Sequence, residues 1–151
     1  GSLDSPTGVE RLSGYRDALA QHGIAVRDAL IAEGKWSPAS GAAAVSQLLT
    51  RGEAFTALVA SNDDMAIGAI RQLHESGVAT PGAVSVIGFD DVAIAPYIVP
   101  SLSSVRIPVT EMIRETISRL IFMLDGGEFK PQQTFSGELI LRDSVIDGPH
   151  R

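Results

Sequence analysis

Residues 57–89 read ALVASNDDMAIGAIRQLHESGVATPGAVSVIGF, with an apolar run at each end and a helical pattern between them. The runs at 57–60 and 84–89 are short and continuously apolar, which is typical of strands buried in a parallel sheet. Between them, Asn62 can cap a helix whose apolar residues recur at helical spacing until Gly77. A strand, a helix and a second strand in this order predict a βαβ unit with parallel strands.

The same alternation continues on both sides of this unit. Upstream, we expect a loop at 4–7, a helix at 9–19, a strand at 29–33, and a helix that begins at Pro38 with Ser37 as its cap. Downstream, we expect a strand at 103–106, a long helix that Pro108 opens, and a strand at 138–142. This order predicts an α/β fold, a three-layer αβα sandwich built on a parallel sheet with helices on both faces.

Composition limits the classes of function. The chain has 151 residues, enough for one domain with a sizeable core, and its 44% hydrophobic and 20% charged residues are ordinary globular values. A net charge of −6 opposes binding to phosphate backbones, so the chain by itself should not bind nucleic acid. It has no cysteine, no apolar run long enough for a membrane span and no signal-peptide pattern at its start. We therefore expect a cytoplasmic protein without membrane contact.

Polar side chains follow the predicted strands at the edge of the sheet where ligands of parallel α/β proteins bind. Asn62 follows the strand at 57–60, Asp90 and Asp91 follow the strand that ends at Phe89, and Trp36 follows the candidate strand at 29–33. An asparagine amide can bridge adjacent hydroxyls, a carboxylate accepts strong hydrogen bonds, and an indole offers an apolar face to a ring. This set of groups suits a polyol or a purine.

Each of these residues also has a purely structural interpretation. Asn62 can be only a helix cap, and Asp90 with Asp91 can be a solvated turn. Trp36 can be a half-buried packing residue, and Arg11 can be a surface charge on a helix. The sequence taken residue by residue leaves these alternatives open.

Catalysis has weak support. His22, His74 and His150 stand apart from any nucleophile motif, and the chain contains no nucleophile elbow, phosphate-binding loop or paired-histidine metal motif. We predict no catalytic residue, no metal site and no cofactor. An enzyme on a doubly wound sheet stays the third hypothesis, because the fold alone does not exclude it.

Several segments together resemble one family. They are RLSGYRDAL at 11–19, SNDDMAIGA at 61–69, VSVIGFDD at 84–91, PSLSSVR at 100–106 and the closing Arg142-Asp143-Ser144. In this order and spacing they resemble the LacI/GalR-type bacterial transcriptional regulators over nearly the whole chain. The first two patterns are shared more loosely with periplasmic sugar-binding proteins, so a sugar-binding component of a transport system is the alternative hypothesis.

The resemblance implies a ligand site. Its residues, in chain order, are a small hydroxyl residue near the ligand, an arginine that reaches into the effector cleft, an aromatic that stacks on the effector, an effector-binding asparagine and an effector-binding aspartate: Thr7, Arg11, Trp36, Asn62 and Asp90. Ile107 departs from the family, since many members have a glutamine there. This departure leaves the effector open between a sugar and a purine-like molecule.

The resemblance also implies a domain plan. The chain corresponds to the C-terminal part of a periplasmic-binding-protein-like effector core of a repressor, with the C-terminal subdomain at 1–106, a crossover helix at 107–127, and a return strand and tail at 128–151. The helix-turn-helix head, through which such a protein contacts DNA, and most of the first subdomain lie outside this sequence. The resemblance further implies a homodimer.

The crossover helix is expected to lack its usual packing partner, the first subdomain. Its apolar stripe comprises Met112, Ile113, Ile117, Leu120, Ile121 and Leu124. An exposed stripe of this size favours association, so we expect that the chain either self-associates through this helix or is a piece of a longer protein.

Overall fold

The computed structural model describes residues 1–128 and 133–148, and its sheet has the strand order β1-β2-β3-β4. The strands are β1 (Ala57–Val59), β2 (Ser85–Asp90), β3 (Ser103–Arg106) and β4 (Glu138–Ile140). The main helices are α1 (Pro6–Gln21), α2 (Pro38–Thr50), α3 (Asp63–Glu75) and α4 (Val109–Leu124), and two 3₁₀ turns are η1 (Asp28–Leu30) and η2 (Ala95–Tyr97). This arrangement confirms the predicted α/β fold.

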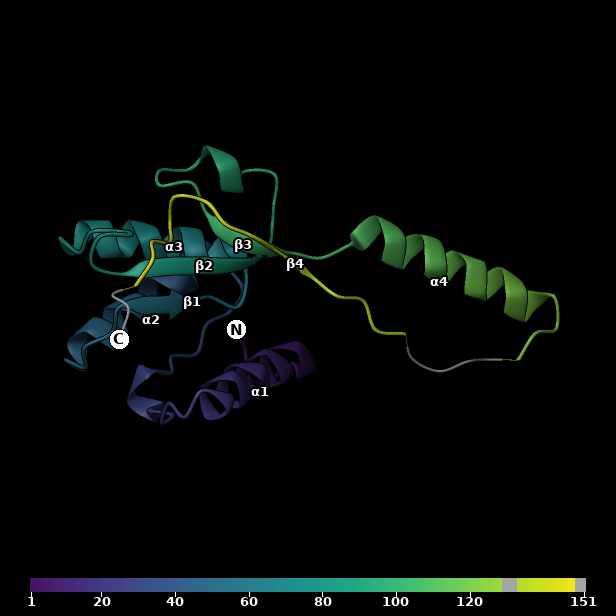
Figure 1. The fold of residues 1–151 in the computed structure, drawn as a ribbon, viewed down its shortest axis with the longest axis horizontal. Coiled ribbons are helices and arrows are strands. Elements are labelled where there is room, and N and C mark those ends of the chain that lie inside the picture. The colour runs from purple at the N-terminus through teal and green to yellow at the C-terminus, as the bar shows by residue number, and fades with distance from the viewer. Residues whose placement is uncertain (129–132, 149–151) are drawn as a thin grey trace.

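The sheet is mixed rather than wholly parallel. Strands β1, β2 and β3 run parallel, as predicted, whereas β4 pairs antiparallel with β3. After β3 the chain enters α4 and later returns to pair with β3 as β4, so β4 runs in the direction opposite to β3 (Figure 1).

Capping side chains set the starts of three helices. Ser5 accepts a hydrogen bond from the Gly8 N–H, so α1 begins at Pro6 and not after the predicted loop at 4–7. Ser37 and Ser40 form a reciprocal capping box at the start of α2. Asn62 caps α3 by accepting from the Met65 N–H. The starts predicted for α2 and α3 are confirmed.

The predicted strand at 29–33 is wrong. Residues 28–30 form the turn η1 instead, and no strand pairs with the outer edge of β1 in the described residues. The Arg51 guanidinium donates to the carbonyl oxygens of Ala29 and Ile31, so a side chain occupies acceptors that a ladder would use. β1 is consequently an edge strand, and Val59, expected to be buried, is 64% exposed.

The core lies between the sheet and the helices α2 and α3. Its largest buried side chains include Val45, Met65, Ile70, Leu73, Val86 and Leu102. The two helices approach closely because Gly41 faces the Met65 backbone and Gly68 faces the Pro38 carbonyl, where a Cβ would collide. This packing fixes the start of α3 against the carboxyl ends of β1 and β2.

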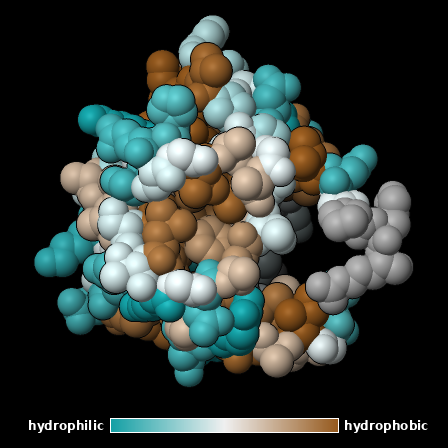
Figure 2. Space-filling view, turned by 90° about the vertical axis from the view of Figure 1, so that its left-hand side faces the viewer, coloured by the Kyte–Doolittle hydropathy of each residue, from teal (hydrophilic) through white to brown (hydrophobic). Residues whose placement is uncertain are grey.

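Helix α4 extends away from the rest of the molecule on two connections (Figure 1). None of its residues is buried, and all six apolar residues of the predicted stripe are exposed, Leu124 to 78%. A shallow groove of about 280 Å³ runs along its first turns, between Ile107 and Ile117. The opposite end of the molecule has hydrophobic residues near its centre and mostly hydrophilic ones around them (Figure 2). Within the described residues, no helix is both long enough and apolar enough to cross a bilayer.

Candidate functional site

Arg11 lies at the centre of the site, beyond the carboxyl ends of β1 and β2. It reaches from α1 and donates to the main-chain carbonyl of Ser61, two residues after the end of β1. Its Nη2 also lies 3.4 Å from Oδ1 of Asp90, at the end of β2. The two side chains are 24% and 32% exposed, so the pair is partly open to solvent. The structure thus brings together two residues that stand far apart in the sequence.

Two aromatic rings flank the Arg11 guanidinium. Its central carbon lies 3.9 Å from the ring centroid of Phe89 and 5.5 Å from that of Trp36. A guanidinium over an aromatic face gains cation–π attraction, which restricts where the charge can go. Sequence reasoning missed Phe89, although an aromatic residue directly before the candidate Asp90 was an available signal.

Asn62 both caps a helix and contacts another residue of the site. Its Oδ1 caps α3 through the Met65 N–H, and its Nδ2 donates to the Trp36 carbonyl at 3.1 Å. The cap interpretation is therefore confirmed. The amide still has a second N–H and a second oxygen lone pair, which are free to take part in binding.

Thr7 lies at the edge of this group. It is exposed on α1, one turn before Arg11, and within the described residues its side chain makes no hydrogen bond to any of the other four predicted residues. Ile107 lies outside the group as well, since it lines the groove beside α4. Arg11, Trp36, Asn62 and Asp90 form the compact part of the site.

Two features give Asp90 unusual properties. Burial raises the pKa of its carboxyl, and the nearby charge of Asp63 adds to this, while the Arg11 charge opposes it; the net effect is a raised pKa. Its backbone φ of 111° lies in the region that non-glycine residues rarely adopt, and Asp91 follows with φ 53°. Strain of this kind persists only where the surrounding structure holds it.

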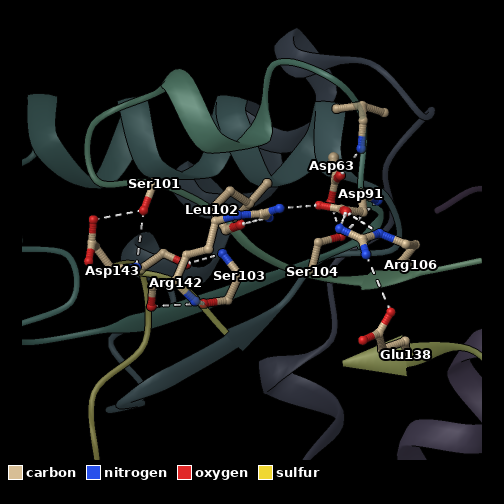
Figure 3. Close-up of polar contacts among 12 residues, drawn as sticks. Asp63, Asp91, Ser101, Leu102, Ser103, Ser104, Arg106, Glu138, Arg142 and Asp143 are labelled. Carbon is tan, nitrogen blue, oxygen red and sulfur yellow. Dashed lines mark hydrogen bonds and ion pairs between the residues drawn. The ribbon is translucent and has the colours of Figure 1, made fainter. Parts of the chain in front are cut away.

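A second set of polar residues lies behind the site, between β2, β3 and the segment after β4 (Figure 3). Asp91 forms ion pairs with Arg106 and Arg142, each at 2.7 Å, and Asp63 accepts a 2.6 Å hydrogen bond from the Ser104 hydroxyl. Sequence reasoning did not identify these contacts. The interpretation of Asp91 as a solvated turn residue is wrong, because its side chain is 5% exposed.

Neither of the two described histidines lies among the site residues. His22 follows α1 as its C-cap and His74 lies exposed on α3, while His150 lies outside the described residues. The described part of the chain also contains no group of three or more acidic or histidine side chains that could hold a metal ion.

Known proteins are similar to this chain in sequence and fold. A model of the periplasmic binding protein-like domain matches residues 2–145. The chain is 73% identical over 146 residues to the HTH-type transcriptional regulator AscG of Escherichia coli (strain K12), a match that covers 97% of this chain and 44% of AscG.

Two solved structures extend the comparison to ligand-bound and DNA-bound relatives. The transcriptional regulator CelR in complex with cellobiose matches with a TM-score of 0.89 and 35% identity, over 95% of this chain and 44% of that one. The lac repressor dimer bound to operator and the anti-inducer ONPF matches with a TM-score of 0.90 and 30% identity, over 97% of this chain and 51% of that one. The chain therefore spans about half the length of the proteins that it matches.

Proposed function

The chain belongs to the periplasmic binding protein-like domain family, in the form found in LacI-type transcriptional regulators, and from this we propose that it forms the C-terminal part of the effector-binding core of a repressor. The observation that supports the proposal is the Arg11–Asp90 pair between Phe89 and Trp36 at the carboxyl ends of the strands. Such an edge is where parallel α/β folds bind ligands. The chain then senses a small molecule and catalyses no reaction.

The groups of the site suit a polyhydroxylated ligand. The Asp90 carboxylate can accept from two hydroxyls, and the Arg11 guanidinium offers a planar fork of donors. The spare N–H of Asn62 and the face of Trp36 add a polar and an apolar contact. The similar regulator CelR forms a complex with cellobiose, so a sugar is the first candidate effector and a purine-like molecule the second.

The exposed face of α4 fits a place against the first subdomain of a two-lobed core. Residues 107–127 then cross between the lobes, and 128–151 return to the C-terminal subdomain formed by 1–106. Effector binding between the lobes would change their relative position and, through it, the geometry of a DNA-binding head. This assignment accounts for the six apolar residues that α4 exposes, because the first subdomain would cover them.

We also propose a homodimer, since one similar structure is a dimer. The segment around η2 offers a surface for a second copy, because Ile94, Tyr97 and Val99 are all exposed there, Val99 to 92%. Contact with DNA would be made only through a helix-turn-helix head, and a regulator of this kind acts in the cytoplasm. A periplasmic transport component is not favoured, because the similar proteins named above are regulators.

Calorimetry on the whole regulator that contains this chain tests the proposal. We expect one of cellobiose, glucose, xylose and hypoxanthine to give a measurable heat of binding, and we expect Asp90→Ala to abolish that binding. Asp28→Ala, which removes an exposed carboxylate from a surface ion pair, is the matched control and should bind as the wild type does. Binding that survives Asp90→Ala unchanged would refute the assignment of the site.

A further inference from the structure

Asp63, the first residue of α3, is a fully buried carboxylate beside the site. Burial of a charge is costly unless a cation or several hydrogen bonds compensate. Asp91 has two arginines for this purpose, whereas in the described part of the chain no cation pairs with Asp63. Burial raises the pKa of the Asp63 carboxyl and the Asp91 charge adds to this, while hydrogen bonds from Ser104 and the main chain oppose it; the net effect is a raised pKa. What Asp63 contributes must therefore come from the groups that it contacts.

This buried carboxylate contacts the chain on both sides of Asp90. Its Oδ2 accepts from the Val92 N–H at 2.8 Å, and its Oδ1 accepts from the Ser104 hydroxyl at 2.6 Å (Figure 3). The Ser104 oxygen accepts in turn from the Asp91 N–H at 3.1 Å, which belongs to the peptide directly after Asp90. Before Asp90, Gly88 lies so close to Oδ1 that a Cβ there would collide with it. The carboxylate thus holds the backbone both before and after the ligand-facing residue.

The backbone between these contacts needs such support. Asp90 and Asp91 have φ of 111° and 53°, which non-glycine residues keep only where the surrounding structure holds them. The N–H groups of Asp91 and Val92 are the donors that Ser104 and the buried carboxylate fix. Release of these donors would let the pair relax towards negative φ and would move the Asp90 carboxylate from its 3.4 Å contact with Arg11.

We propose that Asp63 is a positioning residue, which holds the left-handed pair Asp90-Asp91 and so directs the Asp90 carboxylate towards Arg11 and the effector. The inference deepens the proposed function and rests on it, because only a ligand role for Asp90 makes this positioning matter for binding. Asn62 and Asp63, adjacent at the start of α3, then have separate tasks. Asn62 offers its amide to the ligand, and Asp63 fixes a second ligand-binding group.

Hydrogen exchange on the whole regulator, without any effector, tests the positioning directly. In Asp63→Ala the Val92 amide loses its acceptor, so we expect exchange in the segment 88–94 to accelerate about tenfold or more. Asp63→Asn keeps an oxygen for Val92 and turns an N–H towards Ser104, whose oxygen can accept it, so exchange should stay near the wild-type rate. Asp64→Ala removes the neighbouring exposed carboxylate from the same first turn of α3 and is the matched control, with no change expected.

Effector affinity gives the second measurement, by calorimetry with the effector that the panel identifies. Asp63→Ala should bind about 10- to 100-fold more weakly, as for loss of one hydrogen bond to a charged group, and Asp63→Asn should recover most of the affinity. Ser104→Ala is a smaller change that leaves Oδ1 without its donor and the Asp91 N–H without its acceptor. It should weaken binding in the same direction, and it decides the question where Asp63→Ala does not fold. Ile70→Val removes one buried methyl group from the same helix and should bind as the wild type does.

Two results would overturn the proposal. One is exchange in 88–94 that is as slow in Asp63→Ala and Ser104→Ala as in Asp64→Ala. The other is Asp63→Asn binding as weakly as Asp63→Ala. Binding that survives Asp90→Ala overturns the proposed function instead, and the exchange measured without effector still decides what Asp63 holds, so the two failures are separate.

Discussion

The Arg11 guanidinium lies 3.9 Å from the centroid of the Phe89 ring. Arg11 therefore contacts two consecutive residues of β2, the ring of Phe89 and the carboxylate of Asp90. Phe89→Leu removes the aromatic face and keeps an apolar side chain. A cation–π contact contributes about 0.5–2 kcal/mol, so we expect effector affinity to fall roughly 2- to 30-fold. Calorimetry with the effector identified by the panel measures it. Phe89→Tyr keeps the ring and should bind almost normally; equal losses in both variants would contradict the contact.

The stability of the fold should depend on the ionised form of Asp91. Burial by itself raises the pKa of this carboxyl, but contact with Arg142 and Arg106 and the attraction of their charges outweigh burial, so the pKa lies below the usual value. A group whose pKa is lower in the folded state stabilises the fold above its unfolded-state pKa, and that contribution is lost as pH falls through the folded-state value.

We therefore expect the free energy of unfolding to decline below about pH 4, in part because Asp91 becomes protonated. Asp91→Asn should remove that part of the decline and lower stability at pH 7 by less than the roughly 3–5 kcal/mol of a fully buried pair, since Arg106 is half exposed. Urea unfolding at a series of pH values gives both quantities. A variant with the same acid slope as the wild type would show that Asp91 is not the titrating group.

Gly68 should not tolerate a larger residue. A Cβ there would meet the Pro38 carbonyl across the contact between α3 and α2, so Gly68→Ala must move one helix and should cost about 1–3 kcal/mol. Gly14→Ala on α1 is the matched control, because a Cβ there meets no atom within 4 Å. Loss of glycine at such a helical position should stabilise the chain by about 0.5–1 kcal/mol. In thermal unfolding, the melting temperature should therefore fall in Gly68→Ala and rise in Gly14→Ala.

The exposed face of α4 should make the 151-residue chain associate. Burial of six large apolar side chains yields about 1.5–3 kcal/mol each, which is comparable to the total stability of a domain. Light scattering should detect dimers or larger species, and the double change Ile117→Lys with Leu120→Lys should shift them towards smaller species, because it removes the α4 contact and leaves the surface around η2 intact. Ser118→Lys adds a charge on the same exposed helix without removing an apolar residue and should have a much smaller effect. A monomeric wild-type chain with α4 intact would count against this face as the contact.

The parts of the fold that sequence reasoning predicted correctly are those with local signals. Helix α3 begins at Asp63 because Asn62 caps it and ends before Gly77, whose φ is 74°, and both signals lie within the segment itself. The strand expected at 29–33 failed because its carbonyls are bound by Arg51, a residue from the far end of the next helix. No pattern within 29–33 could reveal that partner.

The candidate site shows the same division. A position beyond the ends of parallel strands was enough to propose Asn62 and Asp90, whose neighbourhood the topology dictates. Trp36 was proposed from the strand expected at 29–33, which the structure does not contain, so for this residue only the resemblance to the family pointed to the site. The arginine came from resemblance and not from spacing, since Arg11 lies on a helix that precedes the sheet. The buried role of Asp91 depends on Arg142, which returns to the site only after the excursion to α4. Long-range electrostatic partners of this kind have no local sequence signal.

The consecutive left-handed residues at the end of β2 also limit how this cleft can change its preference for ligands. At φ of 111° and 53°, positions 90 and 91 strongly disfavour β-branched and bulky side chains, and Trp36, with φ 62°, is under a similar restriction. Substitutions that change ligand preference and keep the backbone conformation must then lie at residues with negative φ. A directed library for new specificity should spare these three positions and diversify the exposed face of α1 around Thr7 instead.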